Sequence, residues 1–306
     1  MKKITIIGAG RVGETTSLVL ANEGLCGEVA LYDIREGAAE GAAQDIRQSA
    51  SFFEFDVKVK GSNDPAIIAD SSLVIVTAGS PRQPGMSRSD VLDVNRAVID
   101  SVVDQVLEFA ADAMLMIVTN PVDVLTWYAW KRTGWDRSRV FGQAGVLDAS
   151  RMASFISQET GLSARDIHTM VIGGHGDTMV PLFSHSSISG IPVTDFLDSD
   201  AMESIANRTR HGGAAVLALR KSSSAYNAPA AAITTMVDAI SHDRKRILPC
   251  VCVLDGEYGQ SNVTVGVPAL LGQGGVEKVI ELSLGETEQA GFRKSIDDIR
   301  MEIERL

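Results

Sequence analysis

The stretch Lys3-Ile4-Thr5-Ile6-Ile7-Gly8-Ala9-Gly10-Arg11-Val12-Gly13 decides the fold of this 306-residue chain. Its β-branched opening predicts a buried strand, and a helix is predicted from Val12 to Asn22. Between them, Gly8 permits a tight turn, Gly10 allows close approach to the backbone, and Gly13 allows the helix to pack against the sheet. This order predicts a phosphate-binding site at the N-terminus of the helix.

A carboxylate follows at the spacing that a dinucleotide site requires. A second predicted strand, Glu28 to Tyr32, ends in Asp33, about 20 residues beyond Gly13. There a carboxylate accepts hydrogen bonds from ribose hydroxyls and repels a 2′-phosphate, although Asp33 is also compatible with an ordinary surface turn. The combination favours NAD over NADP, with the candidate binding residues Gly8, Ala9, Gly10, Arg11, Val12, Gly13 and Asp33.

The first half continues as an alternation of strands and helices. Strands are predicted at Asp56 to Lys60, Leu73 to Val76 and Met114 to Val118, with helices at Glu36 to Ser49 and Val91 to Phe109. Fully apolar strands between helices indicate a parallel sheet that is covered on both faces. We therefore predict an α/β fold with a Rossmann-type doubly wound parallel sheet, and ligands at the carboxyl ends of its strands.

Two loops at those carboxyl ends contain residues suited to ligand binding. The first, Ala78 to Asp90, carries prolines, glycines and the arginines Arg82 and Arg88, which is typical of a mobile lid that brings positive charge to a ligand. A solvated loop is the alternative. The second loop carries Asn120, which offers a donor and an acceptor, although Asn-Pro is also common turn punctuation.

The regular alternation ends near Gly142, so we predict a dinucleotide-binding domain over residues 1–143 and an α+β substrate domain over 144–306. Asp148 lies at the start of a predicted helix and Arg151 follows one turn later, so both can face one cleft. A helix N-cap with a surface arginine is the alternative. In the second half, helices are predicted at Asp200 to Leu219, Ala228 to Ile240 and Glu286 to Leu306. An antiparallel strand pair is predicted at Leu248 to Leu254 and Val263 to Val267.

His175 is the candidate centre of the chemistry. It lies in Ile172-Gly173-Gly174-His175-Gly176-Asp177, where glycines on both sides let a ligand approach an imidazole that titrates near neutral pH. A histidine that caps the end of a strand is the plainer alternative. Metal binding with Asp177 is a third, but two ligands are too few to predict a metal site.

Composition excludes several classes of partner. The net charge is −11, and no cluster of lysine and arginine suggests nucleic acid or an anionic membrane as partner. Cys26, Cys250 and Cys252 have neither zinc-site spacing nor an even number, which favours free thiols in a reducing compartment. We find no secretory signal and no apolar run of membrane-spanning length.

These motifs together resemble the lactate/malate dehydrogenase family along essentially the whole chain. The resemblance rests on Gly8-Ala9-Gly10 with Gly13, Asp33, Pro81-Arg82-Gln83-Pro84-Gly85-Met86-Ser87-Arg88, Thr119-Asn120-Pro121, Gly145-Val146-Leu147-Asp148 with Arg151, and Gly173-Gly174-His175-Gly176-Asp177. It implies that His175 accepts and donates the proton and that Asp148 orients it. It also implies that Arg151 binds the C1 carboxylate of the substrate, while Arg88 polarises the reacting carbonyl.

The resemblance also implies a substrate and an assembly. The arginine at position 82 resembles the malate branch of the family, in which an arginine pairs with a second carboxylate of the substrate. The resemblance therefore implies a small dicarboxylate substrate (malate or oxaloacetate) and NAD as cofactor. Asn120 is expected beside the substrate and the nicotinamide, its bond to Pro121 is expected to be cis, and Asn95 and Val118 are expected beside NAD. A homodimer or homotetramer, a cytoplasmic location and a place in the tricarboxylic acid cycle complete these expectations.

Two other functions share part of the pattern. An NAD-dependent glycosidase also begins with a Rossmann-like half, but it needs a metal held by cysteine and histidine, and the cysteines are far from His175 in sequence. A non-catalytic NAD sensor needs the glycine motif and Asp33 but has no use for His175 together with several arginines.

Overall fold

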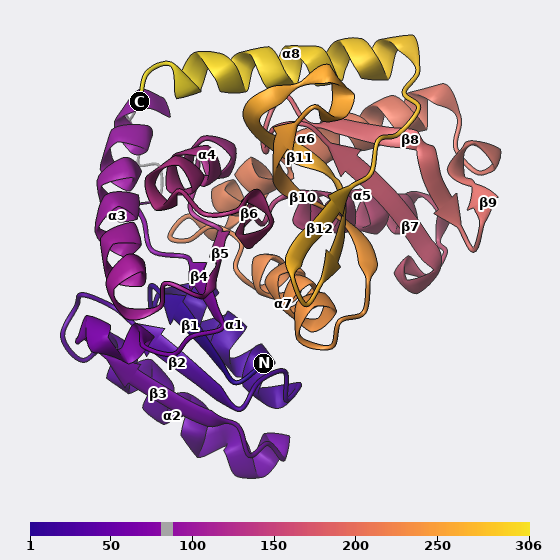
Figure 1. Cartoon of the computed structure of the whole chain (residues 1–306). Coiled ribbons are helices and arrows are strands. Elements are labelled where there is room, and N and C mark those ends of the chain that lie inside the picture. Colours follow the sequence, from indigo (N-terminus) through magenta and orange to yellow (C-terminus); the bar gives the residue numbers. More distant parts are fainter. Residues whose placement is uncertain (81–87) are drawn as a thin grey trace.

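The computed structural model of the chain describes residues 1–80 and 88–306, without the side chains of 88–90 (Figure 1). Strands and helices alternate through the first half, as the sequence predicts. The strands are β1 (Lys3–Ile7), β2 (Glu28–Tyr32), β3 (Lys58–Ser62), β4 (Leu73–Val76), β5 (Met114–Ile117) and β6 (Val140–Gly142). The helices are α1 (Arg11–Asn22), α2 (Ala38–Phe53), α3 (Arg88–Phe109) and α4 (Val122–Thr133).

The six strands of the first half form a parallel sheet in the order β3-β2-β1-β4-β5-β6. Strands β1, β2 and β3 follow one another from the middle of the sheet toward one edge. The chain then returns to the other side of β1, and β4, β5 and β6 follow one another in the opposite direction. Because parallel crossovers are right-handed, this reversal places α1 and α2 on one face of the sheet and α3 and α4 on the other. The crevice for a ligand therefore lies between the carboxyl ends of β1 and β4.

Burial explains why these short segments become central strands. Every residue of β4 is buried, as are four of the five residues of β1 and β2. Side chains that are apolar on both faces can only be accommodated between two layers of helices. The predicted strand at Asp56 to Lys60 is shifted by two residues, since pairing of Lys58 with Glu28 and of Ser62 with Tyr32 fixes the register of β3.

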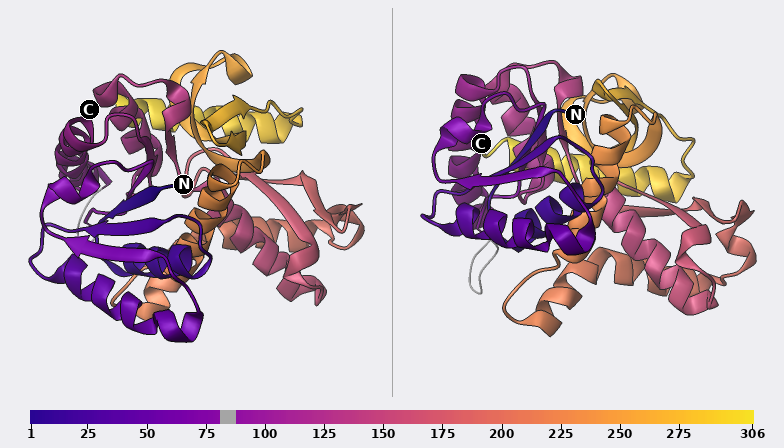
Figure 2. Two further views of the ribbon diagram at one scale, coloured as in Figure 1. Left: turned by 60° about the horizontal axis from the view of Figure 1, so that its bottom comes forward. Right: turned by 90° about the horizontal axis from the view of Figure 1, so that it is seen from below.

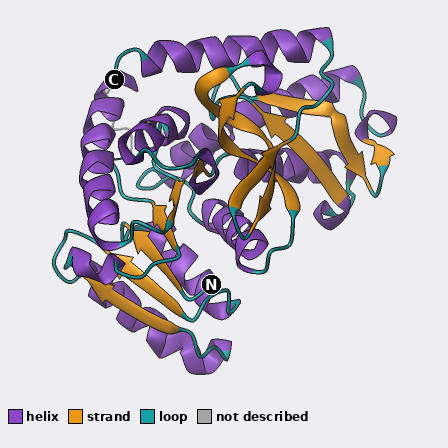
Figure 3. Ribbon diagram, viewed as in Figure 1, coloured by secondary structure: helices purple, strands orange, loops and turns teal. Residues whose placement is uncertain are grey.

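The second half mixes helices with antiparallel strands (Figure 3). Its helices are α5 (Gly145–Thr160), α6 (Ser199–Arg220), α7 (Asn227–Ser241) and α8 (Glu286–Ile303). Its strands are β7 (Ile167–Ile172), β8 (Val180–Ile188), β9 (Ile191–Pro192), β10 (Arg246–Asp255), β11 (Ser261–Gly272) and β12 (Gly275–Val279). The predicted antiparallel pair is confirmed as β10 with β11.

One sheet runs through both halves, which the sequence did not predict. Strands β10, β11 and β12 add to the edge of the parallel sheet, and Val251 of β10 pairs with Gly142 of β6. A Cβ atom on Gly142 would lie 2.9 Å from the Cβ atom of Val251, so only a glycine lets the two strands approach this closely. The domain boundary at 143/144 stays a prediction.

Helix α8 connects the end of the chain to the first half. It runs from the second half back toward α3 (Figures 1 and 2), where Arg96 donates a hydrogen bond of 3.2 Å to the carbonyl of Leu306. Phe292, Ile296 and Ile299 on its inner face are buried. Among the described helices, none is long and apolar enough to cross a membrane.

Candidate active site

The glycine turn opens a hollow at the crevice between β1 and β4. Gly8 has a φ of +106°, which favours glycine, and a Cβ atom on Gly13 would lie 2.0 Å from the carbonyl oxygen of Gly8. At Gly10, by contrast, a Cβ atom would project into open space, and no side chain caps the N-terminus of α1 there. The uncapped N–H groups of α1 face this space, so the hollow fits the pyrophosphate of a dinucleotide.

Asp33 stands beside the glycine turn in a network of hydrogen bonds. Its carboxylate accepts hydrogen bonds from the backbone N–H groups of Ala9 (2.8 Å) and Arg35 (2.9 Å) and pairs with the Arg35 guanidinium. Burial alone raises the pKa of Asp33, but these hydrogen bonds, first those of the Arg35 side chain, lower it on balance. The group is therefore held ionised, as an acceptor for ribose hydroxyls must be.

Asn95 and Asn120 connect the loops that follow β4 and β5. Asn95 is 1% exposed and donates hydrogen bonds to the carbonyls of Asn120 (2.7 Å) and Ser80 (3.2 Å). Its amide therefore holds the floor of the hollow together, and its contact with NAD stays a prediction. Asn95, Asn120 and Val118 all line the hollow, and the Asn120–Pro121 peptide is cis, as the resemblance implied.

Hydrogen bonds from three successive residues hold the start of the glycine-flanked loop of His175. Gly173 exchanges backbone hydrogen bonds of 2.8 and 3.2 Å with Gly266 of β11, and its φ of +88° requires a glycine. The next residue, Gly174, donates its N–H to the hydroxyl of Ser295 on α8 (2.6 Å). The backbone N–H of His175 then donates to Asp123 Oδ2 (2.8 Å). The imidazole is thus presented from a hydrogen-bonded backbone and does not merely cap β7.

His175, Asp148 and Arg151 form one ion-paired cluster. Asp148 Oδ2 lies 2.8 Å from His175 Nδ1, and Asp148 Oδ1 accepts a hydrogen bond of 2.9 Å from Arg151 Nη1. The Asp148 side chain is only 2% exposed. Burial by itself lowers the pKa of His175, but the charge and the hydrogen bond of Asp148, together with the charge of Asp123, outweigh burial and raise that pKa above its ordinary value of 6.5. The structure thus brings Asp148 and Arg151 together with His175.

Two adjacent glycines of α6 lie against Arg151. A Cβ atom on Gly212 would lie 3.2 Å from Arg151 Cδ, which is a tight contact, whereas one on Gly213 would make an ordinary contact of 3.5 Å with Arg151 Nη2. Arg151 lines a second hollow together with Asn120, His175 and residues of α6, α7 and α8. His175 and Asn120 line both hollows. A histidine at the junction can exchange a proton with a substrate that contacts the nicotinamide end of a dinucleotide.

The sequence interpretation missed two buried polar residues of this site. Asp123 looked like an ordinary acidic residue in the first turn of α4, and no sequence signal marks its contact with the distant His175. Burial raises the pKa of Asp123 to about 6, and its Oδ1 atom has no partner among the described residues. Gln143, which follows β6 directly and is 3% exposed, lines the hollow beside the glycine turn, which we call the cofactor hollow.

Other predicted site residues lie apart from this cluster or outside the part of the chain that the structure describes. Arg82 and the side chain of Arg88 lie outside the described residues, so their predicted roles stay predictions. Asp177 is exposed, whereas Asp148 contacts the imidazole. Ser224 and Ala225 line both hollows.

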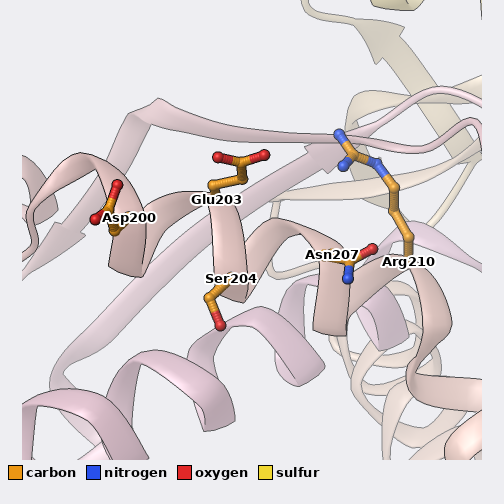
Figure 4. A pocket seen from close by; sticks show the side chains of 5 residues that line it. All are labelled: Asp200, Glu203, Ser204, Asn207 and Arg210. Atoms are coloured by element: carbon orange, nitrogen blue, oxygen red, sulfur yellow. The ribbon is translucent and has the colours of Figure 1, made fainter.

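A separate surface hollow lies on α6 (Figure 4). It is lined by Asp200, Glu203, Ser204, Asn207 and Arg210. Arg210 Nε donates a hydrogen bond of 3.2 Å to the carbonyl of Met179, so this arginine helps to hold α6 against the loop that follows His175. None of these side chains lines the two hollows beside His175.

A dinucleotide crevice that opens beside a carboxylate-held histidine and an arginine is the arrangement of a dehydrogenase, which moves a hydride and a proton together. The comparisons specify the family. Residues 2–142 match the model of the lactate/malate dehydrogenase NAD-binding domain, and residues 145–306 match that of the lactate/malate dehydrogenase α/β C-terminal domain. The chain therefore belongs to the lactate/malate dehydrogenase family.

Individual relatives agree with this assignment. A malate dehydrogenase of Thioalkalivibrio sulfidiphilus is 60% identical over 306 residues, which is 100% of both chains. The crystal structure of a malate dehydrogenase from Cryptosporidium parvum has a TM-score of 0.96 at 36% identity and covers 100% of this chain and 99% of that one. A lactate dehydrogenase of the same organism, in complex with lactic acid and the dinucleotide, has a TM-score of 0.95 at 37% identity over 99% and 97% of the chains. The shared fold therefore does not by itself choose the substrate.

Proposed function

We propose that the chain is an NAD-dependent malate dehydrogenase that interconverts (S)-malate and oxaloacetate. The observation that carries the proposal is the position of His175, between the cofactor hollow and Arg151 and hydrogen-bonded to Asp148. The high identity to relatives named malate dehydrogenase supports the choice of substrate. The arginine at position 82, in the motif Pro81-Arg82-Gln83-Pro84-Gly85, supports it independently.

The cofactor hollow fits NAD, which accepts the C2 hydride of malate when it is bound. Gly10 leaves room for the pyrophosphate at the N-terminus of α1, while Gly8 and Gly13 allow the tight turn and the close packing beside it. In this proposal Asp33 accepts hydrogen bonds from ribose hydroxyls. Ala9, Arg11, Val12, Asn95, Val118 and Asn120 complete the proposed binding set. Asn120 also lines the second hollow, which we call the substrate hollow, and this supports its proposed contact with both ligands.

In malate oxidation, neutral His175 accepts the hydroxyl proton through Nε2, because Nδ1 faces Asp148. Asp148 keeps the ring in one orientation and stabilises the imidazolium that forms. In the reverse direction, the imidazolium returns the proton to the carbonyl oxygen, which Arg88 polarises in this proposal. Arg151 holds the C1 carboxylate of the substrate in a planar two-point contact.

The second carboxylate of the substrate is assigned to Arg82. In a water-excluded site, a carboxylate without a partner is disfavoured by about 2–5 kcal/mol, which corresponds to roughly 30- to 4,000-fold. A charge at this position therefore outweighs the small differences in size among 2-oxo acids.

Substrate selectivity tests this proposal. We expect wild-type protein with NADH to reduce oxaloacetate with a kcat/KM at least about 30-fold above that for pyruvate. Arg82→Gln is expected to lower kcat/KM for oxaloacetate by roughly 30- to 4,000-fold while pyruvate reduction does not fall. Initial rates of NADH oxidation give both values.

Arg132→Gln is the matched control, because Arg132 is a surface arginine that pairs with Asp100 and Asp104, away from both hollows. Its selectivity should equal that of the wild type. Equal use of pyruvate and oxaloacetate by the wild type would refute the assignment to malate.

We further propose a cytoplasmic homodimer or homotetramer that acts in the tricarboxylic acid cycle. The exposure of Ile34, Phe52 and Phe53 on or near α2 supports association through the first half, because exposed apolar side chains of this size are typical of interfaces. The net charge of −11 and the lack of a basic cluster in the sequence support a small-molecule substrate over nucleic acid or an anionic membrane.

A further inference from the structure

We propose that Arg35 forms a subsite for a 2′-phosphate, so that the cofactor hollow also accepts NADP(H). The inference rests on the proposed function only in taking a dinucleotide as the occupant of the hollow. It goes beyond that function because Asp33 alone favours NAD and disfavours the phosphorylated cofactor.

The contacts of Asp33 provide the first step. A carboxylate has about four lone-pair positions, and four N–H groups contact this one. Backbone donors from Ala9 and Arg35 take two positions, while Arg35 Nε and Nη2, each at 3.0 Å, take one on each oxygen. The guanidinium thus occupies the positions that ribose hydroxyls need.

The cofactor must therefore displace the side chain of Arg35 but not the carboxylate. The Arg35 side chain is 64% exposed, so it can rotate with little loss of packing. The backbone N–H groups of Ala9 and Arg35 continue to hold Asp33 in place. Since Arg35 lies only two residues after Asp33 and lines the same hollow, the displaced guanidinium remains beside the ribose.

Charge and shape then favour a phosphate at this position. A guanidinium presents several N–H groups in one plane, which matches phosphate oxygens and is the usual partner of the 2′-phosphate in NADP sites. Arg35 also offsets the negative charge of Asp33 that would repel the phosphate. Arg11 lines the hollow as well and adds to its positive potential.

Binding titrations without substrate test the subsite. Nicotinamide fluorescence gives the Kd of NADH and of NADPH for wild-type protein, and we expect the two values to lie within about 100-fold of each other. Arg35→Gln should raise the ratio of the NADPH Kd to the NADH Kd by about 10- to 150-fold, because charge-assisted hydrogen bonds are lost. The NADH Kd should stay equal or fall, because Arg35 no longer competes for Asp33.

Two further variants separate a specific contact from a general effect of charge. Arg11→Gln removes the same charge from the same hollow and is expected to change the ratio much less than Arg35→Gln does. Arg35→Lys retains the charge without the planar fork and should give an intermediate ratio. The proposal is overturned by a rise of less than about tenfold for Arg35→Gln, by an equal rise for Arg11→Gln, or by a parallel loss of NADH binding.

The same titrations are independent of the proposed catalytic function. If the ratio shifts as expected but the protein does not turn over malate, the 2′-phosphate subsite is supported and the assignment to malate is wrong. If the protein oxidises malate with NAD+ but the ratio does not shift, the catalytic function is supported and the subsite is wrong.

Discussion

Replacement of His175 with alanine is expected to lower kcat for oxaloacetate reduction by about 100- to 10,000-fold, the range typical for loss of a general acid. The imidazole is the group that Asp148 holds beside both hollows, and alanine can neither donate nor accept a proton. Binding of NADH should change little, because the glycine turn and Asp33 are untouched. Steady-state rates and an NADH titration measure the two effects separately.

The matched control is His185→Ala. His185 is a half-buried histidine on β8, where its ring contacts Ser184, and neither hollow includes it. Its removal should leave kcat within about twofold of wild type, because the side chain contacts neither hollow. A His175→Ala variant with near-normal turnover would show that another group transfers the proton.

Replacement of Arg151 with glutamine is expected to lower kcat/KM for oxaloacetate by roughly 30- to 4,000-fold. The side chain of Arg151 is 15% exposed, so a substrate carboxylate loses a buried ionic partner. Arg151→Lys should recover only part of the loss, because lysine lacks the planar pair of donors. Initial rates over a range of oxaloacetate concentrations measure the effect.

Arg165→Gln is the control for this substitution, because Arg165 lies exposed in the turn Ala164–Asp166. It should leave kcat/KM unchanged. If Arg151→Gln retains wild-type kcat/KM, the C1 carboxylate binds elsewhere.

The sequence predicts the first half well because its signals are local. An apolar strand, a glycine turn and a helix follow one another between Lys3 and Asn22, and each depends on residues close in the chain. The union of β10 with β6 could not be predicted in this way. Its single paired position joins Gly142 to Val251, residues far apart in sequence, and it depends on the space that the glycine leaves.

The candidate site also contains some residues that local sequence marks and others that only the folded chain brings together. His175 and Arg151 stand out because of glycine flanks and helix spacing, and family resemblance paired the imidazole with Asp148. Asp123 was missed, because only the folded chain brings its carboxylate to the backbone of His175. Arg35 was missed for a different reason, since a charged residue after a strand usually indicates a solvated turn, and only its contacts with Asp33 distinguish it.

The pH dependence of kcat/KM in both directions tests the central claim, that His175 carries the proton in this dehydrogenase. Oxaloacetate reduction needs the imidazolium, so it should hold at low pH and fall by about tenfold per unit above the pKa of His175. Malate oxidation needs the neutral ring and should rise with pH toward a plateau. Because Asp148 raises this pKa, both transitions should lie above 6.5.

Asp148→Asn sharpens the measurement, because it removes the charge that raises the pKa of His175. In this variant, kcat/KM for oxaloacetate reduction should begin to fall at a lower pH than in the wild type. Opposite limbs in the two directions, with this shift in Asp148→Asn, are the result we predict. Flat profiles in both directions between about pH 5 and 9 would contradict the role of His175.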